Sequence, residues 1–173
     1  MATARLLAAA VTHRGEKLVR LFDASPVLMV FLRHAGCMFC REALADIAKC
    51  LAGIEGNGVR VVLVHMGDGA DIEGLLKRYG LEGLDRIADP EQNLYRTFGL
   101  KRGRPGQLFG LHVWIRAIFD GVLRRHGLGK ARADSKQMPG LFLIDRGEIV
   151  RWFRHRDVAD QPDYVMLTAM GAE

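Results

Sequence analysis

The stretch PVLMVFLRHAGCMFCREALADIAKCLAGIEGNGVRVVLVHM, residues 26–66, decides the fold of this chain. It contains two apolar runs of strand length, VLMVFLR (27–33) and VRVVLVHM (59–66), which are typical of strands buried on both faces. Between the runs, apolar residues recur at helical spacing and predict a helix: Cys40, Leu44, Ile47, Ala48, Leu51. Glycines at 53, 56 and 58 predict the end of that helix. The stretch therefore predicts a βαβ unit with two parallel strands and a right-handed crossover.

The flanking segments extend this unit into one α/β domain. KLVRLF (17–22) predicts a short strand, and residues 71–79 predict a surface helix. A further helix is expected after Asp89, as N-cap, with Pro90 in the first helical position. Near the end, PGLFLIDRGEIVRWF predicts a hairpin that turns at residues 145–147, and a closing helix is expected over 161–170. We expect a single domain over 1–173, with an N-terminal helical extension (1–15) and a helical insertion (100–137) before the hairpin.

Composition limits the functional classes that remain. The chain has 173 residues and a net charge of +5, from 25 basic and 20 acidic residues that are dispersed along it. Dispersed charge is typical of a solvated surface, so nucleic-acid binding is not expected. No run approaches the 18 apolar residues that a membrane span needs. A CxxC pair in a chain with three cysteines is more often catalytic or metal-binding than part of a secreted disulfide framework, so a cytoplasmic location is expected.

The position of the pair Cys37–Cys40 indicates redox chemistry. Cys37 stands where a buried strand passes into a helix, and the free N–H groups and dipole of a helix start favour a thiolate. We expect Cys37 to be exposed and nucleophilic, and Cys40, on the apolar stripe, to be the buried partner that resolves the product as an intramolecular disulfide. His34 and Arg41 are candidate supporting residues, because they lie three positions before and four after Cys37.

Two other interpretations of the pair stay open. One CxxC is half of a common zinc site, but the chain has no second CxxC, CxxH or HxxxH, so no metal is expected. The cysteines could also be small apolar residues of the core. Cys50 lies ten positions after Cys40, on a different side of the helix, and is expected to be a buried small hydrophobe.

Together these features resemble the thioredoxin fold: a strand, CxxC at a helix start, a second parallel strand, and Pro139 directly before a late hairpin strand. More narrowly, FLRHAGCMFCRE, ADPEQNLYRTFGL and QMPGLFLIDRGEIVRWFRHRDVADQPDY resemble the peroxiredoxin-like proteins of the alkyl hydroperoxide reductase and thiol-specific antioxidant superfamily. The branch they resemble includes prostamide/prostaglandin F synthase-like proteins. The resemblance implies a thioredoxin-like sandwich with a central mixed sheet and helices on both faces. It also implies a cis peptide at Pro139, next to the cysteines.

The resemblance implies a thiol-dependent antioxidant enzyme that needs no cofactor, takes a peroxide or a disulfide as substrate and is reduced by a thioredoxin- or glutathione-type thiol. Typical peroxiredoxins carry proline and threonine seven and three positions before the nucleophile, where this chain has Val30 and His34. That departure supports an alternative, a non-catalytic thioredoxin-fold module that binds partners or senses redox state. The apolar stripe of the insertion needs a cover, which could be the domain's own sheet, a second copy in a homodimer, or a substrate pocket: Leu108, Leu111, Trp114, Ile115, Phe119.

Overall fold

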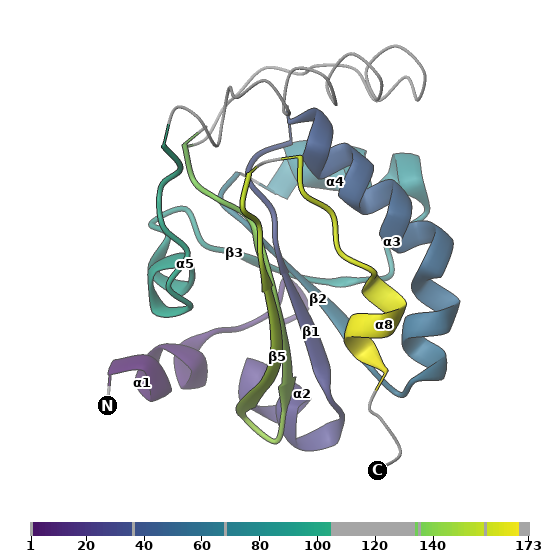
Figure 1. Cartoon of the computed structure of the whole chain (residues 1–173). Helices are drawn as coiled ribbons and strands as arrows, with labels where there is room; N and C mark the ends of the chain where they lie inside the picture. Colours follow the sequence, from purple (N-terminus) through teal and green to yellow (C-terminus); the bar gives the residue numbers. More distant parts are fainter. Residues whose placement is uncertain are drawn as a thin grey trace.

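The computed structural model describes residues 2–35, 37–67, 69–104, 134, 136–157 and 159–169. Its elements follow one another along the chain in a βαβ-based order (Figure 1). They are α1 (Ala2–Ala9), α2 (Leu18–Ala24), β1 (Val27–Phe31), α3 (Met38–Gly56), β2 (Arg60–His65), α4 (Gly69–Tyr79), β3 (Asp85–Ala88), α5 (Asn93–Thr97), β4 (Gly140–Asp145), β5 (Glu148–Arg154) and α8 (Tyr164–Thr168). The predicted insertion stripe over 107–125 lies outside the described residues.

The centre of the fold is a five-stranded mixed sheet in the order β3-β2-β1-β4-β5. β1 pairs in parallel with β2, and β2 with β3, whereas β4 runs antiparallel to both β1 and β5. All five residues of β1 are buried, because both faces of this central strand are covered. The predicted βαβ unit with parallel strands is therefore confirmed, and so is the expected mixed sheet.

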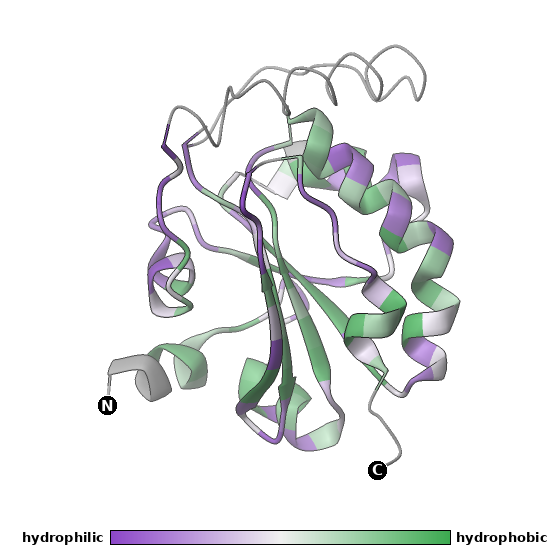
Figure 2. Ribbon diagram, viewed as in Figure 1, coloured by the Kyte–Doolittle hydropathy of each residue, from purple (hydrophilic) through white to green (hydrophobic). Residues whose placement is uncertain are grey.

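Each face of the sheet carries its own hydrophobic core. Leu28 and Val30 of β1 point into a core shared with α3, α4 and α8, whereas Met29 and Phe31 point into a second core shared with α1, α2 and α5. In Figure 1 these two sets of helices lie on opposite sides of the strands. Figure 2 shows the central strands and the inward sides of α2 and α3 as the most apolar parts of the chain. The arrangement is the α/β sandwich expected from the sequence.

The hairpin of β4 and β5 is also confirmed. Its turn contains Arg146 and Gly147 with φ of 49° and 83°, the left-handed pair that matches the twist of a two-residue hairpin loop. β4 is almost wholly buried, whereas six of the seven residues of β5 are exposed, as expected for the edge strand of the sheet. Because β4 and β5 run antiparallel, the residue before β4, Pro139, and the residue after β5, His155, lie at the same end of the sheet.

The prediction of a strand at 17–22 is wrong, because this segment forms α2. Leu18, Leu21 and Phe22 are its buried residues, and their spacing of three and four places is that of a helix with one apolar face. The run was too short for its period to be recognised. β3 was missed for a related reason, since a four-residue strand at the sheet edge has little apolar pattern.

Three helix boundaries differ from expectation. α3 continues through Gly53 and ends at Gly56, with Asn57 as its C-cap, because its packing against the core outweighs the low helix propensity of glycine. α5 begins only at Asn93, yet Asp89 still caps it: the carboxylate accepts from the backbone N–H groups of Asn93, Leu94 and Tyr95. The closing helix is short, Tyr164–Thr168, with the Asp163 side chain accepting from the N–H of Met166. Among the described residues, no helix has the length and hydropathy to cross a membrane.

Candidate active site

The two cysteines lie where the loop after β1 enters α3, beyond the carboxyl end of the central strand. Cys37 is the N-cap of α3, with the extended backbone (φ −77°, ψ 124°) that this position requires. Its N–H donates to His34 O at 3.0 Å, and its carbonyl accepts from Arg41 N at 3.2 Å. Cys40 follows within the first turn of the helix. The expected placement of the pair at a helix start is therefore present, and the dipole of α3 favours a negative sulfur there.

Both sulfur-bearing residues are buried. Cys37 is 5% exposed and Cys40 is 4% exposed, so the expectation of an exposed Cys37 is wrong. The reason is that the first turn of α3 packs into the core on its side of the sheet, together with Leu32 and Met138. Burial shields the pair from water, which strengthens the electrostatic interactions that act on each sulfur.

Arg33 is the basic residue whose guanidinium donates to the nucleophile, and sequence reasoning did not single it out. Its Nη1 donates to Cys37 Sγ at 3.2 Å, and its backbone N–H donates to Cys40 Sγ at 3.2 Å. Nε of the same guanidinium donates to Gln137 O at 3.0 Å, which holds the side chain in place. A buried arginine is unusual without an acceptor for its charge. The signal available in the sequence was this single cation at the end of a wholly apolar run, four residues before Cys37.

The pair is polarised into one acidic and one weakly acidic thiol. The pKa of Cys37 is lowered to about 5, and the largest cause is a hydrogen bond from the Cys40 side chain, which outweighs the opposing effect of burial. The Arg33 charge, the Cys40 backbone N–H and His34 contribute to the same lowering. The same hydrogen bond, together with burial and the Cys37 charge, raises the pKa of Cys40 well above its ordinary value. At neutral pH the arrangement therefore favours a Cys37 thiolate held by a Cys40 thiol.

The two supporting residues predicted from the sequence lie in the loop and at the helix start. Burial lowers the pKa of His34, the charge of Cys37 acts in the opposite direction, and the buried Nδ1 of His34 has no hydrogen-bond partner. Arg41 Nε donates to Ala35 O at 3.1 Å, which ties the first turn of α3 to the loop before it. Their participation in chemistry stays a prediction.

Pro139 lies next to Cys40, as the resemblance implied, but its peptide bond is not cis. No cis peptide bond occurs among the described residues, which include Met138 and Pro139. Trans is the intrinsically favoured isomer, and here the Met138 N–H donates to Lys101 O at 3.2 Å within that geometry. The expectation of a cis proline is therefore corrected.

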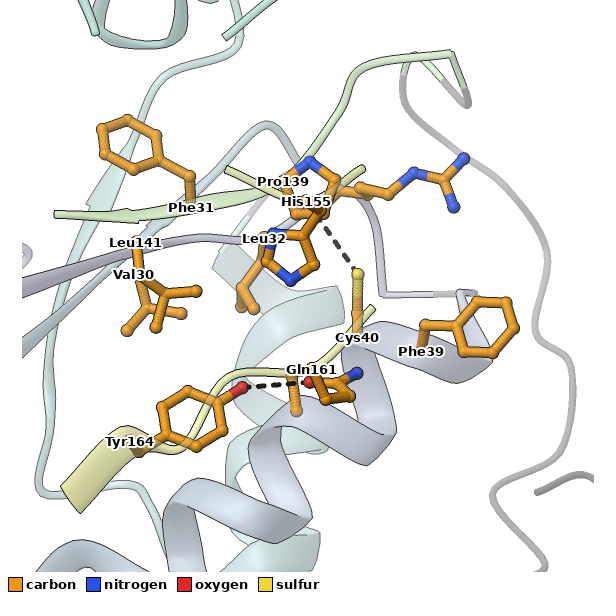
Figure 3. A pocket seen from close by; sticks show the side chains of 12 residues that line it. Val30, Phe31, Leu32, Phe39, Cys40, Pro139, Leu141, His155, Gln161 and Tyr164 are labelled. Carbon is orange, nitrogen blue, oxygen red and sulfur yellow. Dashed lines mark hydrogen bonds between the residues drawn. The ribbon is translucent and has the colours of Figure 1, made fainter. Parts of the chain in front are cut away.

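A small cavity of about 20 Å³ lies on the inner side of Cys40 (Figure 3). Its polar groups come from Arg33, Cys40, His155, Gln161 and Tyr164, and Pro139 and apolar residues of β1, α3 and β4 complete the wall. The Tyr164 hydroxyl donates to Gln161 Oε1 at 3.3 Å across one side of it. The volume is enough for about one water molecule.

Cys50 takes no part in this arrangement. It is partly buried against the core, and its thiol donates to Asp46 O, four residues earlier, at 3.0 Å. All three cysteines are unpaired. In the part of the chain that the structure describes, there is no cluster of three or more His, Cys, Asp or Glu residues suited to a metal ion.

Tyr95 of α5 connects the carboxyl ends of β1 and β2 through its hydroxyl, and removal of this hydroxyl should measurably lower the stability of the fold. Its side chain is wholly buried, and its hydroxyl donates to Leu32 O and lies 3.0 Å from Val64 O. We expect Tyr95→Phe to lower the free energy of unfolding by about 2 kcal/mol, because buried carbonyls lose a donor. Urea denaturation measures this. Tyr164→Phe, which removes a longer bond of 3.3 Å, is the matched control and should cost less than about 1 kcal/mol. Equal losses in the two variants would contradict the assignment.

Comparison with known proteins agrees with this fold. The sequence model for AhpC/TSA antioxidant enzymes matches residues 45–159, more than half of the chain, although the match begins after the cysteine pair. A prostamide/prostaglandin F synthase of Salmo salar is 31% identical over 164 residues, covering 91% of this chain and 78% of the relative. A peroxiredoxin-like 2C protein of Bos taurus is 25% identical over 145 residues, covering 78% of this chain, which spans 62% of that relative.

Among solved structures, the crystal structure of peroxidoxin BcpB from Mycobacterium tuberculosis superposes with a TM-score of 0.63 at 13% identity. The superposition covers 92% of this chain and 89% of that one. At such low identity the likeness concerns the fold, and it confirms the thioredoxin-like sandwich.

Proposed function

This chain belongs to the AhpC/TSA antioxidant enzyme family, and we propose that it is a thiol-dependent oxidoreductase with Cys37 as its nucleophile. Cys40 is the resolving residue. The observation that carries the proposal is the polarisation of the pair: Arg33 Nη1 lies 3.2 Å from Cys37 Sγ, and the pKa of Cys37 falls to about 5 while that of Cys40 rises. Because the thiolate is the attacking species, this difference supports an order in which Cys37 attacks and Cys40 resolves.

With a hydroperoxide as substrate, the first step is attack of the Cys37 thiolate on the terminal oxygen. The O–O bond breaks, Cys37 becomes a sulfenic acid, and the alkoxide leaves and is protonated to the alcohol. The Cys40 sulfur then attacks Cys37 Sγ, an S–S bond forms, and the hydroxyl departs as water with the proton of Cys40. Two electrons have passed from the dithiol to the peroxide.

With a disulfide as substrate, the same two sulfurs act in the same order. The Cys37 thiolate forms a mixed disulfide and releases one thiol, and Cys40 then displaces the second thiol and leaves the intramolecular disulfide. In either case a thioredoxin- or glutathione-type thiol must reduce that disulfide to complete a cycle. The sulfurs supply the electrons, so the chemistry requires no organic cofactor.

The comparisons favour a peroxide as the oxidant, because the family is one of antioxidant enzymes and one relative is named peroxiredoxin-like. The salmon relative is named for making prostamide and prostaglandin F, and an organic substrate of that kind is a candidate here as well. The CxxC spacing and the absence of threonine at position 34 favour disulfide exchange instead. The two readings share the role of Cys37 and differ in what it attacks.

Alkylation of Cys37 as a function of pH tests the proposal. The thiolate reacts and the thiol does not, so a depressed pKa requires the rate to rise as pH increases through about 5 and to be level above pH 7. Iodoacetamide labelling followed by peptide mass spectrometry measures this, with Cys50 in the same sample as an internal control whose pKa burial raises. A Cys37 profile with the midpoint of an ordinary thiol would defeat the proposal. Parallel assays of hydroperoxide consumption and insulin disulfide reduction then identify the oxidant.

The burial of the pair favours a second candidate, a redox-sensing module without turnover. With 5% exposure, Cys37 offers little surface to a large substrate, and a slow stoichiometric oxidation would suffice for a sensor. This candidate predicts one disulfide per chain on mild oxidation and no catalytic consumption of peroxide or insulin disulfide in the presence of a thiol reductant. Multiple turnovers per chain would exclude it.

A further inference from the structure

His155 is a partly buried histidine that lines the same cavity as Cys40, and the chemistry above does not use it. It directly follows β5, and its ring contacts Phe153 edge-on, with centroids 4.9 Å apart. The backbone carbonyl of Pro139, which can only accept a hydrogen bond, favours the protonated ring and so acts to raise the pKa of His155. Its Nδ1 is shielded from solvent and has no hydrogen-bond partner.

A neutral imidazole has one N–H and one nitrogen lone pair, and no hydrogen bond occupies Nδ1. In the tautomer with the hydrogen on Nε2, Nδ1 therefore offers a free lone pair that can accept a proton. His155 and Cys40 line the same small cavity, and Figure 3 shows the ring beside the Cys40 sulfur. The cavity volume of about 20 Å³ allows one water molecule to connect the two groups. A buried acceptor without a donor is costly, and its position suggests a use.

Resolution by Cys40 creates a need for such an acceptor. In the reduced protein the Cys40 thiol donates to the Cys37 thiolate. Once Cys37 is oxidised, its negative charge is gone, and the proton of Cys40 must leave before or during the attack of its sulfur. Cys40 is 4% exposed, so bulk water has poor access to that proton.

We propose that His155 is the proton acceptor for Cys40 in the resolving step, through Nδ1 and the shared cavity. The inference rests on the proposed function. As Cys40 Sγ attacks Cys37 Sγ, its proton passes to His155, an S–S bond forms, and the group on Cys37 leaves with its electron pair. The imidazolium then returns the proton to that leaving group, as water from a sulfenic acid or as a thiol from a mixed disulfide. Proton and electron counts are the same as in the uncatalysed step.

The charges around His155 determine how long it can hold a proton. Burial, the largest effect, lowers its pKa to about 4, so the ring is neutral at physiological pH, is a weak base, and holds a proton from Cys40 only transiently. Asp160 and Asp157 stabilise the imidazolium that forms, whereas Arg33 opposes it and so favours return of the proton. The other titratable groups that line the cavity are Arg33, Cys40 and Tyr164. Burial raises the pKa of Tyr164, which keeps its hydroxyl neutral.

The two chemical steps can be observed separately with one equivalent of 4,4′-dithiodipyridine in a Cys50→Ser background. Attack by Cys37 releases a first thiopyridone, and resolution by Cys40 releases a second. In His155→Asn the amide can hydrogen-bond but cannot take the proton. We expect its first phase to be unchanged within about twofold and its second phase to be slowed about 10-fold or more at pH 7. The deficit should close as pH rises, because hydroxide then replaces the lost base.

Tyr164→Phe is the control, since it alters the same cavity but leaves the acceptor. It should keep both phases and the wild-type pH dependence. An unchanged second phase in His155→Asn and in a second variant, His155→Gln, would overturn the inference. So would a deficit that is equal at all pH values, or one that Tyr164→Phe reproduces, since each indicates packing rather than proton transfer. Absence of the first phase in the background protein would instead refute the proposed function itself.

Discussion

A Cys37→Ser variant should lose turnover by roughly 1,000-fold or more, with peroxide or disulfide as substrate, because among the described residues the site has no second thiol with a lowered pKa. A serine hydroxyl cannot be ionised by the interactions that lower the pKa of Cys37 to about 5. The change removes one sulfur from a buried position, so the free energy of unfolding should change far less than the rate. Steady-state consumption of the substrate, coupled to a thiol reductant, measures the loss.

Cys40→Ser should fail at a later point in the same cycle. Its Cys37 can still attack, so the first equivalent of substrate reacts, but the product remains as a sulfenic acid or a mixed disulfide that mass spectrometry can identify. Cys50→Ser is the matched control, because Cys50 donates to Asp46 O within its own helix and not to the pair. It should retain activity within about twofold. Full activity of Cys37→Ser, or accumulation of the mixed disulfide on Cys40, would reverse the assigned roles.

The sequence predicted those elements whose pattern of apolar residues or turn residues extends over the whole element. The two apolar runs at 27–33 and 59–66 became β1 and β2, and the Asp145–Gly147 turn identified the hairpin. α2 and β3 were missed because seven and four residues are too few to distinguish helical from strand spacing. Tertiary packing decides the conformation of both: α2 buries Leu18, Leu21 and Phe22 in the core on one face of the sheet, and β3 pairs with β2 as an edge strand.

Only those features of the candidate site that depend on residues adjacent in the sequence were predicted. The placement of Cys37 and Cys40 at the start of α3 followed from the strand and helix pattern, and the structure has it. Arg33, His155 and Gln137 could not be predicted, because their relation to the cysteines depends on where side chains point and on contacts over as many as 104 residues. Burial of Cys37 was missed for the same reason, since it arises from packing against Met138 and its neighbours, far along the chain.

Arg33→Met should make the Cys37 thiol markedly less acidic. The substitution removes the donor at 3.2 Å from Cys37 Sγ and the charge beside it, while it keeps a long apolar side chain. A hydrogen bond to a charged group contributes about 1.5–3 kcal/mol, which corresponds to roughly 10- to 100-fold in the ratio of thiolate to thiol. Alkylation of Cys37 should therefore be slowed by about that factor near pH 5 and little above pH 8, where the thiolate forms in both proteins. The sign follows because losing a cation disfavours the anion.

Two further variants show which property of Arg33 matters. Arg33→Lys keeps a positive charge but not the planar fork that also donates to Gln137 O, so it should recover only part of the thiolate. Arg41→Met is the matched control: it removes an arginine one turn into α3, whose Nε donates to Ala35 O. If the Arg41 variant moves the alkylation midpoint and the Arg33 variant does not, the cation that stabilises Cys37 is the one first expected from helical spacing. If Arg33 dominates, the stabilising charge comes from the strand end, and the nucleophile depends on the β1–α3 junction as a whole rather than on its helix alone.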